Sequence, residues 1–110
     1  MTAIRGLSCA HCGRPIATLN DGWVEWTRNI TAGPSTYGGF RIVHHDVGCM
    51  YNSRHLFQQN KTDVNMHLDY FVGQAGLNRF TDRLTDGVID DMESYVEVMK
   101  QLITLSYQIR

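Results

Sequence analysis

The stretch CAHCGRPI, residues 9–16, places two cysteines three positions apart and follows them with a glycine. A Cys-x-x-Cys turn supplies two ligands of a tetrahedral zinc site from one tight loop. Gly13 would allow the chain to reverse direction after the second cysteine. The stretch therefore predicts one half of a metal site, whose other ligands must come from elsewhere in the chain.

The only other cysteine is Cys49, which lies in the segment VHHDVGCMYN at residues 43–52. We expect Asp46 to cap a helix that starts at Val47, because aspartate favours the position before a helix. Cys49 would then lie in the first helical turn, and His45 would precede the cap at the end of a strand. Both side chains could point into one site beside the N-terminal cysteines.

These segments together predict a structural zinc ion with four protein ligands, namely Cys9, Cys12, His45 and Cys49. His44 is the substitute for His45, because neighbouring residues on a strand face opposite sides and the register is not known from the sequence. His11, inside the cysteine turn, is a weaker candidate. A redox role for the two thiols is the alternative, but redox Cys-x-x-Cys motifs start a helix, and Pro15 with a strand-like run follows here.

The rest of the first half has a β-strand pattern. The runs IATL and WVEWT flank the turn residues NDG and predict a hairpin over residues 16–27. The glycines and proline of residues 28–39 predict a loop, and FRIVH, residues 40–44, predicts another strand. The helix expected from Val47 continues to about residue 60.

The second half has a helical pattern. VNMHLDYFVGQ, residues 64–74, predicts one helix, and a second is expected after Gly76. The last segment predicts a long amphipathic helix, whose apolar stripe consists of Val88, Ile89, Met92, Tyr95, Val96, Met99, Leu102, Ile103 and Ser106. This stripe could pack in the core or pair with its own copy, and the predicted partner-binding residues are Met92, Tyr95, Met99 and Leu102.

The composition suits one α+β domain over residues 1–110, with a zinc-binding β-rich module at 1–61 and a helical part at 62–110. The chain has 110 residues, of which 43% are hydrophobic and 19% charged, as in ordinary globular proteins. No apolar run is long enough for a membrane span or resembles a signal peptide. Three cysteines do not suit a secreted disulfide scaffold, so we expect a cytoplasmic protein without membrane contact.

The charge is unevenly distributed along the chain. Residues 1–62 carry six basic against three acidic residues, a net +3, and residues 63–110 carry four against eight, a net −4. The basic half also holds the aromatic residues Trp23, Trp26, Tyr37, Phe40 and Tyr51. Aromatic faces and arginines suit nucleic-acid binding, which is therefore the alternative function. A net +3 is weak for that role, and at least one tryptophan of WVEW is expected in the core.

The order of cysteine turn, hairpin and helix resembles the treble-clef zinc-finger class, over residues 9 to about 60. In that class the first turn of the helix completes the zinc site, usually with a second pair of cysteines. Here one histidine of the His44-His45 pair would replace the missing cysteine. The resemblance implies a zinc-stabilised scaffold rather than a particular activity.

We therefore expect a small intracellular, non-enzymatic binding or regulatory protein that acts through protein–protein contacts. Zinc would hold the N-terminal module together, and the C-terminal helix would provide a partner or homodimer surface. A third hypothesis is a metal-dependent nuclease of the His-Me finger type, since VHHD is followed by Asn52 and His55. The short gap from His45 to Asn52 disfavours it, as does the use of a histidine by zinc.

Overall fold

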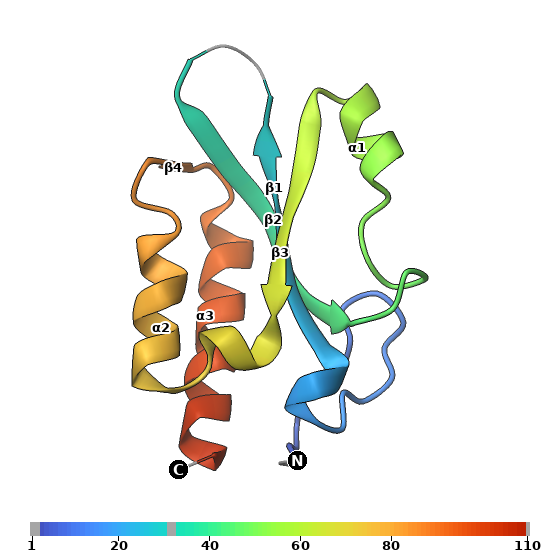
Figure 1. Ribbon diagram of the computed structural model, residues 1–110, viewed down its shortest axis with the longest axis vertical. Coiled ribbons are helices and arrows are strands. Elements are labelled where there is room, and N and C mark those ends of the chain that lie inside the picture. Colours follow the sequence, from blue (N-terminus) through green and yellow to red (C-terminus); the bar gives the residue numbers. More distant parts are fainter. Residues whose placement is uncertain (1–2, 31–32, 110) are drawn as a thin grey trace.

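The computed structural model describes residues 3–30 and 33–109 and shows a mixed α+β fold (Figure 1). Its sheet has four strands in the order β3-β1-β2-β4. The elements follow one another as η1 (Leu19–Asp21), β1 (Gly22–Asn29), β2 (Ser35–His44), α1 (Ser53–Gln58), β3 (Lys61–His67), η2 (Leu68–Phe71), α2 (Gly73–Asp82), β4 (Gly87–Ile89) and α3 (Met92–Gln108).

The central hairpin consists of β1 and β2, which pair antiparallel with Gly22 opposite His44. Strand β3 lies antiparallel on the other side of β1, and β4 lies parallel to β2. Residues Val24 to Thr27 of β1 are all buried, as expected for a strand covered on both faces. The sheet takes strands from both halves of the sequence, so the expected division at residues 61 and 62 runs through the start of β3.

The core lies between the sheet and the helices α2 and α3, which run side by side next to β2 (Figure 1). Phe80 of α2 is fully buried and stacks on Tyr95 of α3, with ring centroids 5.6 Å apart. The rings of Trp26, Phe40 and Phe71 surround Phe80 at centroid distances of 5.8, 6.1 and 5.2 Å. This aromatic cluster joins both halves of the chain, because β1 and β2 supply two of its rings.

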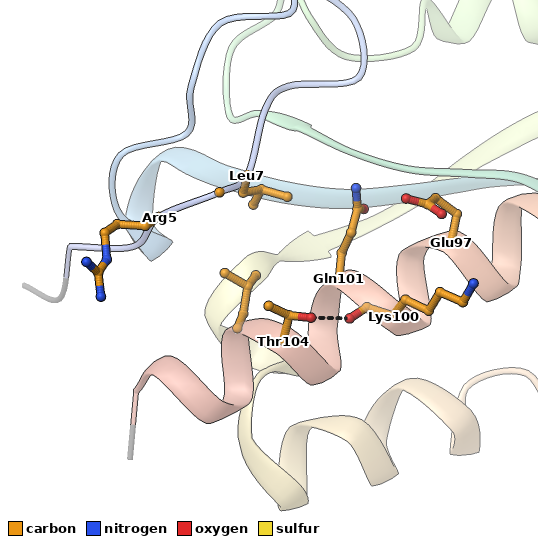
Figure 2. Close-up of a pocket in the computed structure, with 8 residues that line it drawn as sticks. Arg5, Leu7, Glu97, Lys100, Gln101 and Thr104 are labelled. Atoms are coloured by element: carbon orange, nitrogen blue, oxygen red, sulfur yellow. Dashed lines mark hydrogen bonds between the residues drawn. The ribbon is translucent and has the colours of Figure 1, made fainter.

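The N-terminal segment, residues 3–21, is held by few regular hydrogen bonds. It forms two isolated bridges, Ala3 with Thr18 and Ser8 with Pro15, and buries three aliphatic side chains, those of Ile4, Leu7 and Ile16. Figure 2 shows Arg5 and Leu7 beside α3, around a hollow of about 200 Å³. Gln108 at the end of α3 exchanges two hydrogen bonds with the Arg5 backbone, of 2.9 and 2.8 Å.

The predicted hairpin over residues 16–27 is wrong, because β1 pairs with β2 and not with the IATL run. The predicted loop over residues 28–39 is also too long, since β2 already begins at Ser35. Gly39, one of the glycines that suggested a loop, lies in a β-bulge: the register shifts between Glu25 and Thr27, Gly39 has φ +61°, and Gly38 pairs with Thr27. A left-handed glycine adds a residue to one strand without ending the pairing.

The helix predicted from Val47 starts later, at Ser53, with the Asn52 side chain as its cap. The helix predicted over residues 64–74 is wrong, because residues 61–67 form β3. Their side chains are mostly half-buried, which suits the β-branched and alternating pattern of KTDVNMH against β1. The remainder divides into η2 and the start of α2, with the left-handed Gly73 (φ +85°) at the junction.

Helix α3 begins at Met92, and Val88 and Ile89 belong to β4 instead. The buried side chains of α3 are Val98, Leu102 and Leu105. Of the predicted stripe, Leu102 is therefore in the core, whereas Met92, Val96 and Ile103 are 55, 40 and 40% exposed. No helix in the described part of the chain is both long and apolar enough to cross a bilayer.

Candidate metal centre

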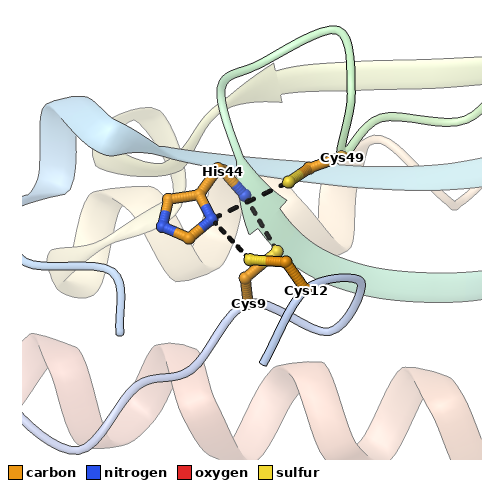
Figure 3. A group of neighbouring side chains, drawn as sticks. All are labelled: Cys9, Cys12, His44 and Cys49. Atoms are coloured by element: carbon orange, nitrogen blue, oxygen red, sulfur yellow. Dashed lines mark hydrogen bonds between the residues drawn. The ribbon is translucent and has the colours of Figure 1, made fainter. Parts of the chain in front are cut away.

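Four potential metal ligands converge where the N-terminal segment meets the end of β2 (Figure 3). They are the sulfurs of Cys9, Cys12 and Cys49 and the imidazole of His44, and their ligand atoms all lie within 4.8 Å of one another. His44 Nδ1 is 3.3 Å from Cys12 Sγ and 3.9 Å from Cys49 Sγ. A tetrahedral zinc site with bonds of about 2.0–2.3 Å needs ligand atoms about 3.3–3.8 Å apart, so small movements would complete it.

The turn over residues 9–13 places the first two sulfurs. The backbone amide of Gly13 donates to the Cys9 carbonyl at 2.9 Å, and the Cys9 amide donates to the Arg14 carbonyl at 2.9 Å. Gly13 has φ +78°, a left-handed conformation that glycine adopts without strain. The Ala10 amide donates to the Ile42 carbonyl at 2.9 Å, which fastens the turn to β2.

His44 is the last residue of β2 and turns its ring toward the sulfurs. Its Nε2 lies 3.0 Å from the Pro15 carbonyl, which can only accept a hydrogen bond, so Nε2 carries the proton and the Nδ1 lone pair faces the cysteines. A ligating histidine typically has its other ring nitrogen held in this way. The His44 backbone amide also donates to Cys9 Sγ at 3.3 Å.

His45, the histidine favoured from the sequence, lies outside this group, and its substitute His44 lies within it. The ring of His45 stacks on Trp23 at a centroid distance of 4.3 Å and an interplanar angle of 16°. Its amide donates to the Asp21 carbonyl at 2.8 Å. The reason is strand alternation: the β1–β2 register directs His44 toward the cysteine turn and His45 to the opposite side.

Cys49 lies in a turn before α1 and not in a first helical turn as predicted. Asp46 organises that turn, since its carbonyl accepts from the Cys49 and Met50 amides at 2.9 and 3.1 Å. The turn does not continue as a helix, because the Tyr51 amide donates to the Glu25 carboxylate at 3.1 and 3.2 Å.

The Glu25 carboxylate is a part of the site that the sequence did not reveal. It is fully buried and pairs with Arg41, whose Nε lies 2.5 Å away. Arg41 in turn donates from Nη2 to the Cys49 carbonyl at 3.1 Å and covers the Tyr51 ring at 3.9 Å. This group braces the loop that carries Cys49. In the sequence, nothing marks the glutamate of WVEWT as buried.

The three thiols differ in their electrostatics. Hydrogen bonds from the backbone and side chain of Arg14 lower the pKa of Cys12 to about 6. Burial opposes ionisation of Cys9, but backbone hydrogen bonds from Cys12, His44 and His11 outweigh it and lower its pKa. Burial and the two neighbouring sulfurs raise the pKa of Cys49 to about 11. A bound cation would remove this conflict, because it stabilises all three thiolates together.

The other residues singled out from the sequence lie elsewhere. His11 is exposed, and Asn52 caps α1 by accepting from the His55 amide at 3.0 Å. Of the aromatic residues proposed for nucleic-acid contact, Trp26, Tyr37 and Phe40 are buried in the core, and Tyr51 lies beneath Arg41. Of the predicted partner-binding residues, Leu102 is fully buried, Tyr95 and Met99 pack against the core, and Met92 is exposed.

No protein-family model, no curated protein and no solved structure matches the chain. The donor set of the candidate metal centre, three sulfurs and one imidazole nitrogen, is one of the sets that hold zinc in structural sites.

Proposed function

We propose that the protein is a small zinc-stabilised binding or regulatory protein that acts through protein–protein contacts. The observation that carries this proposal is the group of Cys9, Cys12, His44 and Cys49, which offers four protein ligands within 4.8 Å of one another. Four protein ligands saturate a tetrahedral zinc ion and leave no position for water or substrate, which is the property of a structural site.

The arrangement also supports a zinc-knuckle scaffold of the treble-clef kind, with the β1–β2 hairpin between the two ligand pairs. It departs from that class in one respect, because Cys49 precedes α1 by a separate turn. Zinc would fix the cysteine turn to the end of β2, and the helices would remain available for contacts. The exposed apolar side chains of α3 favour a protein partner over nucleic acid, since the N-terminal aromatic residues are largely used in the core.

The test is the metal content of the purified protein, measured by mass spectrometry for the native chain and for single variants. We expect one zinc per chain, and its loss or a sharp weakening of its binding in Cys9→Ser, Cys49→Ser and His44→Ala. His45→Ala is the matched control, because it removes the neighbouring imidazole and should retain zinc fully. A native protein that neither contains zinc nor takes it up would overturn the proposal.

A further inference from the structure

Helix α3 has a second apolar face that the rest of the described chain does not cover. Met92, Val96, Ile103 and Tyr107 are 55, 40, 40 and 65% exposed. At 100° per residue these four side chains fall within about 60° of helix rotation, on a face well separated from the buried Val98, Leu102 and Leu105. One helix thus carries one apolar face for the core and one turned outward.

The outward face has an internal symmetry. Residues 92 and 107 are equally distant from a midpoint between Met99 and Lys100, and so are residues 96 and 103. An identical helix placed antiparallel across that midpoint would set Met92 against Tyr107 and Val96 against Ile103. Each of these contacts would form twice, once on each side of the two-fold axis. A two-fold interface requires this kind of self-complementary pattern. We propose, on the basis of the proposed function, that α3 binds the α3 of a second copy of the chain in antiparallel orientation. The protein partner is then a second copy of the chain.

The charges beside this face agree with the same arrangement. Lys100 borders the apolar residues on one side, and Glu97 lies about 60° further around the helix on that same side. Rotation about the two-fold axis keeps that side together in both copies. Glu97 of one copy then approaches Lys100 of the other, with an offset along the helix axis of less than about one helical turn. Within residues 3–30 and 33–109 the ion pair is Arg41 with Glu25, so Glu97 and Lys100 have no intrachain ion-pair partner there.

A groove beside the face provides a site for the end of the second helix. It lies between α2 and α3, has a volume of about 410 Å³, and is lined by Leu77, Ile103, Tyr107 and Ile109 among others. In the antiparallel arrangement Met92 of the second copy lies opposite this groove. A methionine side chain is unbranched and adapts to irregular apolar space.

The first experiment is analytical ultracentrifugation of the zinc-loaded full chain over a range of concentrations. We expect a dimer with a dissociation constant of about 1–10 µM, and a weakening of at least about tenfold in Val96→Asp and in Ile103→Asp, because each places two charges in the apolar contact. Phe57→Asp is the matched control: Phe57 is 69% exposed on α1, so its substitution should leave the dimer unchanged.

A charge exchange tests the antiparallel register. Glu97→Lys and Lys100→Glu should each weaken the dimer about two- to fivefold, and the double variant should restore it, because the pair is only reversed. A native chain that stays monomeric, or a dimer unaffected by the apolar variants, would overturn the proposal. Failure of the double variant to restore the dimer would overturn the antiparallel pairing. Zinc content measured on the same samples keeps this outcome separate from failure of the metal centre.

Discussion

The middle and the end of β2 belong to regions that are stabilised in different ways. At its middle, β2 faces an aromatic core in which Phe40, Phe80 and Tyr95 pack ring against ring. At its end, His44 meets three sulfurs carried by turns and loops. The core region depends on apolar area removed from water, whereas the sulfur region combines a few buried aliphatic side chains with four potential ligands that the proposed zinc ion would crosslink. On this proposal, zinc would add to the stability of segment 3–21 beyond what its buried Ile4, Leu7 and Ile16 provide.

The largest expected effect is that of metal removal, which should separate the two regions. After chelation we expect amide protection to be lost over residues 3–21 and 44–52, where Cys9, Ile16 and Cys49 donate turn and loop hydrogen bonds. The amides of α3 should stay protected, because Leu102 and Leu105 remain in the apolar core. Structural zinc contributes on the order of 10 kcal/mol of apparent binding free energy in small zinc modules. Hydrogen exchange followed by mass spectrometry checks this.

Two results would contradict that division. Equal loss of amide protection throughout the chain would show that the aromatic core does not stay folded after chelation. Unchanged protection near Cys9 would show that the N-terminal turn is held without a cation.

A core substitution should show the reverse pattern. Phe80→Ala removes a fully buried ring at the centre of the aromatic cluster and should lower the free energy of unfolding by about 3–5 kcal/mol. Zinc stoichiometry should remain at the native value, because Phe80 lies on α2, which carries none of the four potential ligands. Urea denaturation and metal analysis of the same sample measure both quantities. Phe80→Leu keeps most of the apolar volume and should lower the free energy of unfolding much less. An equal decrease would show that the loss of apolar volume is not the cause.

The buried pair of Glu25 and Arg41 connects the two regions, so its substitution should affect both. Glu25→Gln leaves Arg41 without its counter-charge, and we expect the free energy of unfolding to fall by about 2–3 kcal/mol, somewhat less than for fully buried pairs because Arg41 is 20% exposed. Zinc affinity should also fall about tenfold, since Arg41 donates to the Cys49 carbonyl. Chemical denaturation and competition with a chromophoric chelator test the two effects. Unchanged zinc affinity would mean that the Cys49 loop is positioned without this brace.

The smallest expected effect concerns the start of α3, a helix that carries none of the four potential metal ligands. Hydrogen bonds from the Ser94 side chain, the Gly39 amide and the Ser94 amide lower the pKa of the Asp91 carboxyl. Asp91 thus contributes stability above its ordinary pKa, and the contribution is lost as the pH falls through the lowered value. Asp91→Ala should lower the free energy of unfolding by about 1 kcal/mol at neutral pH and by less below about pH 4. Thermal melts at several pH values measure this; a difference that does not shrink in acid would exclude the ionised cap as its cause.

The sequence predicts the composition of the metal centre better than the elements that carry it. Sulfur and imidazole ligands are rare enough in a short chain that Cys9, Cys12 and Cys49 with one adjacent histidine could be recognised from spacing. The choice between His44 and His45 could not, because it depends on strand register. The sequence of residues 64–74 predicts a helix because a short apolar run fits both periods, and only the pairing with β1 makes residues 64–67 part of a strand. For α3 the helix was expected, but its buried face is shifted toward Val98 and Leu105 by packing against β2.

The adjacency of His44 and His45 at the end of β2 bears on how the chain reaches its native pairing. A slip of the hairpin by one residue would exchange the faces of the two imidazoles and of every other side chain in the strand. His45 would then meet the sulfurs, and its stacking on Trp23 together with the hydrogen bond from His44 to Pro15 would be lost. A zinc ion bound in the native alignment would leave both histidines with their partners, so it would favour the native strand alignment as well as crosslink the N-terminal segment to β2.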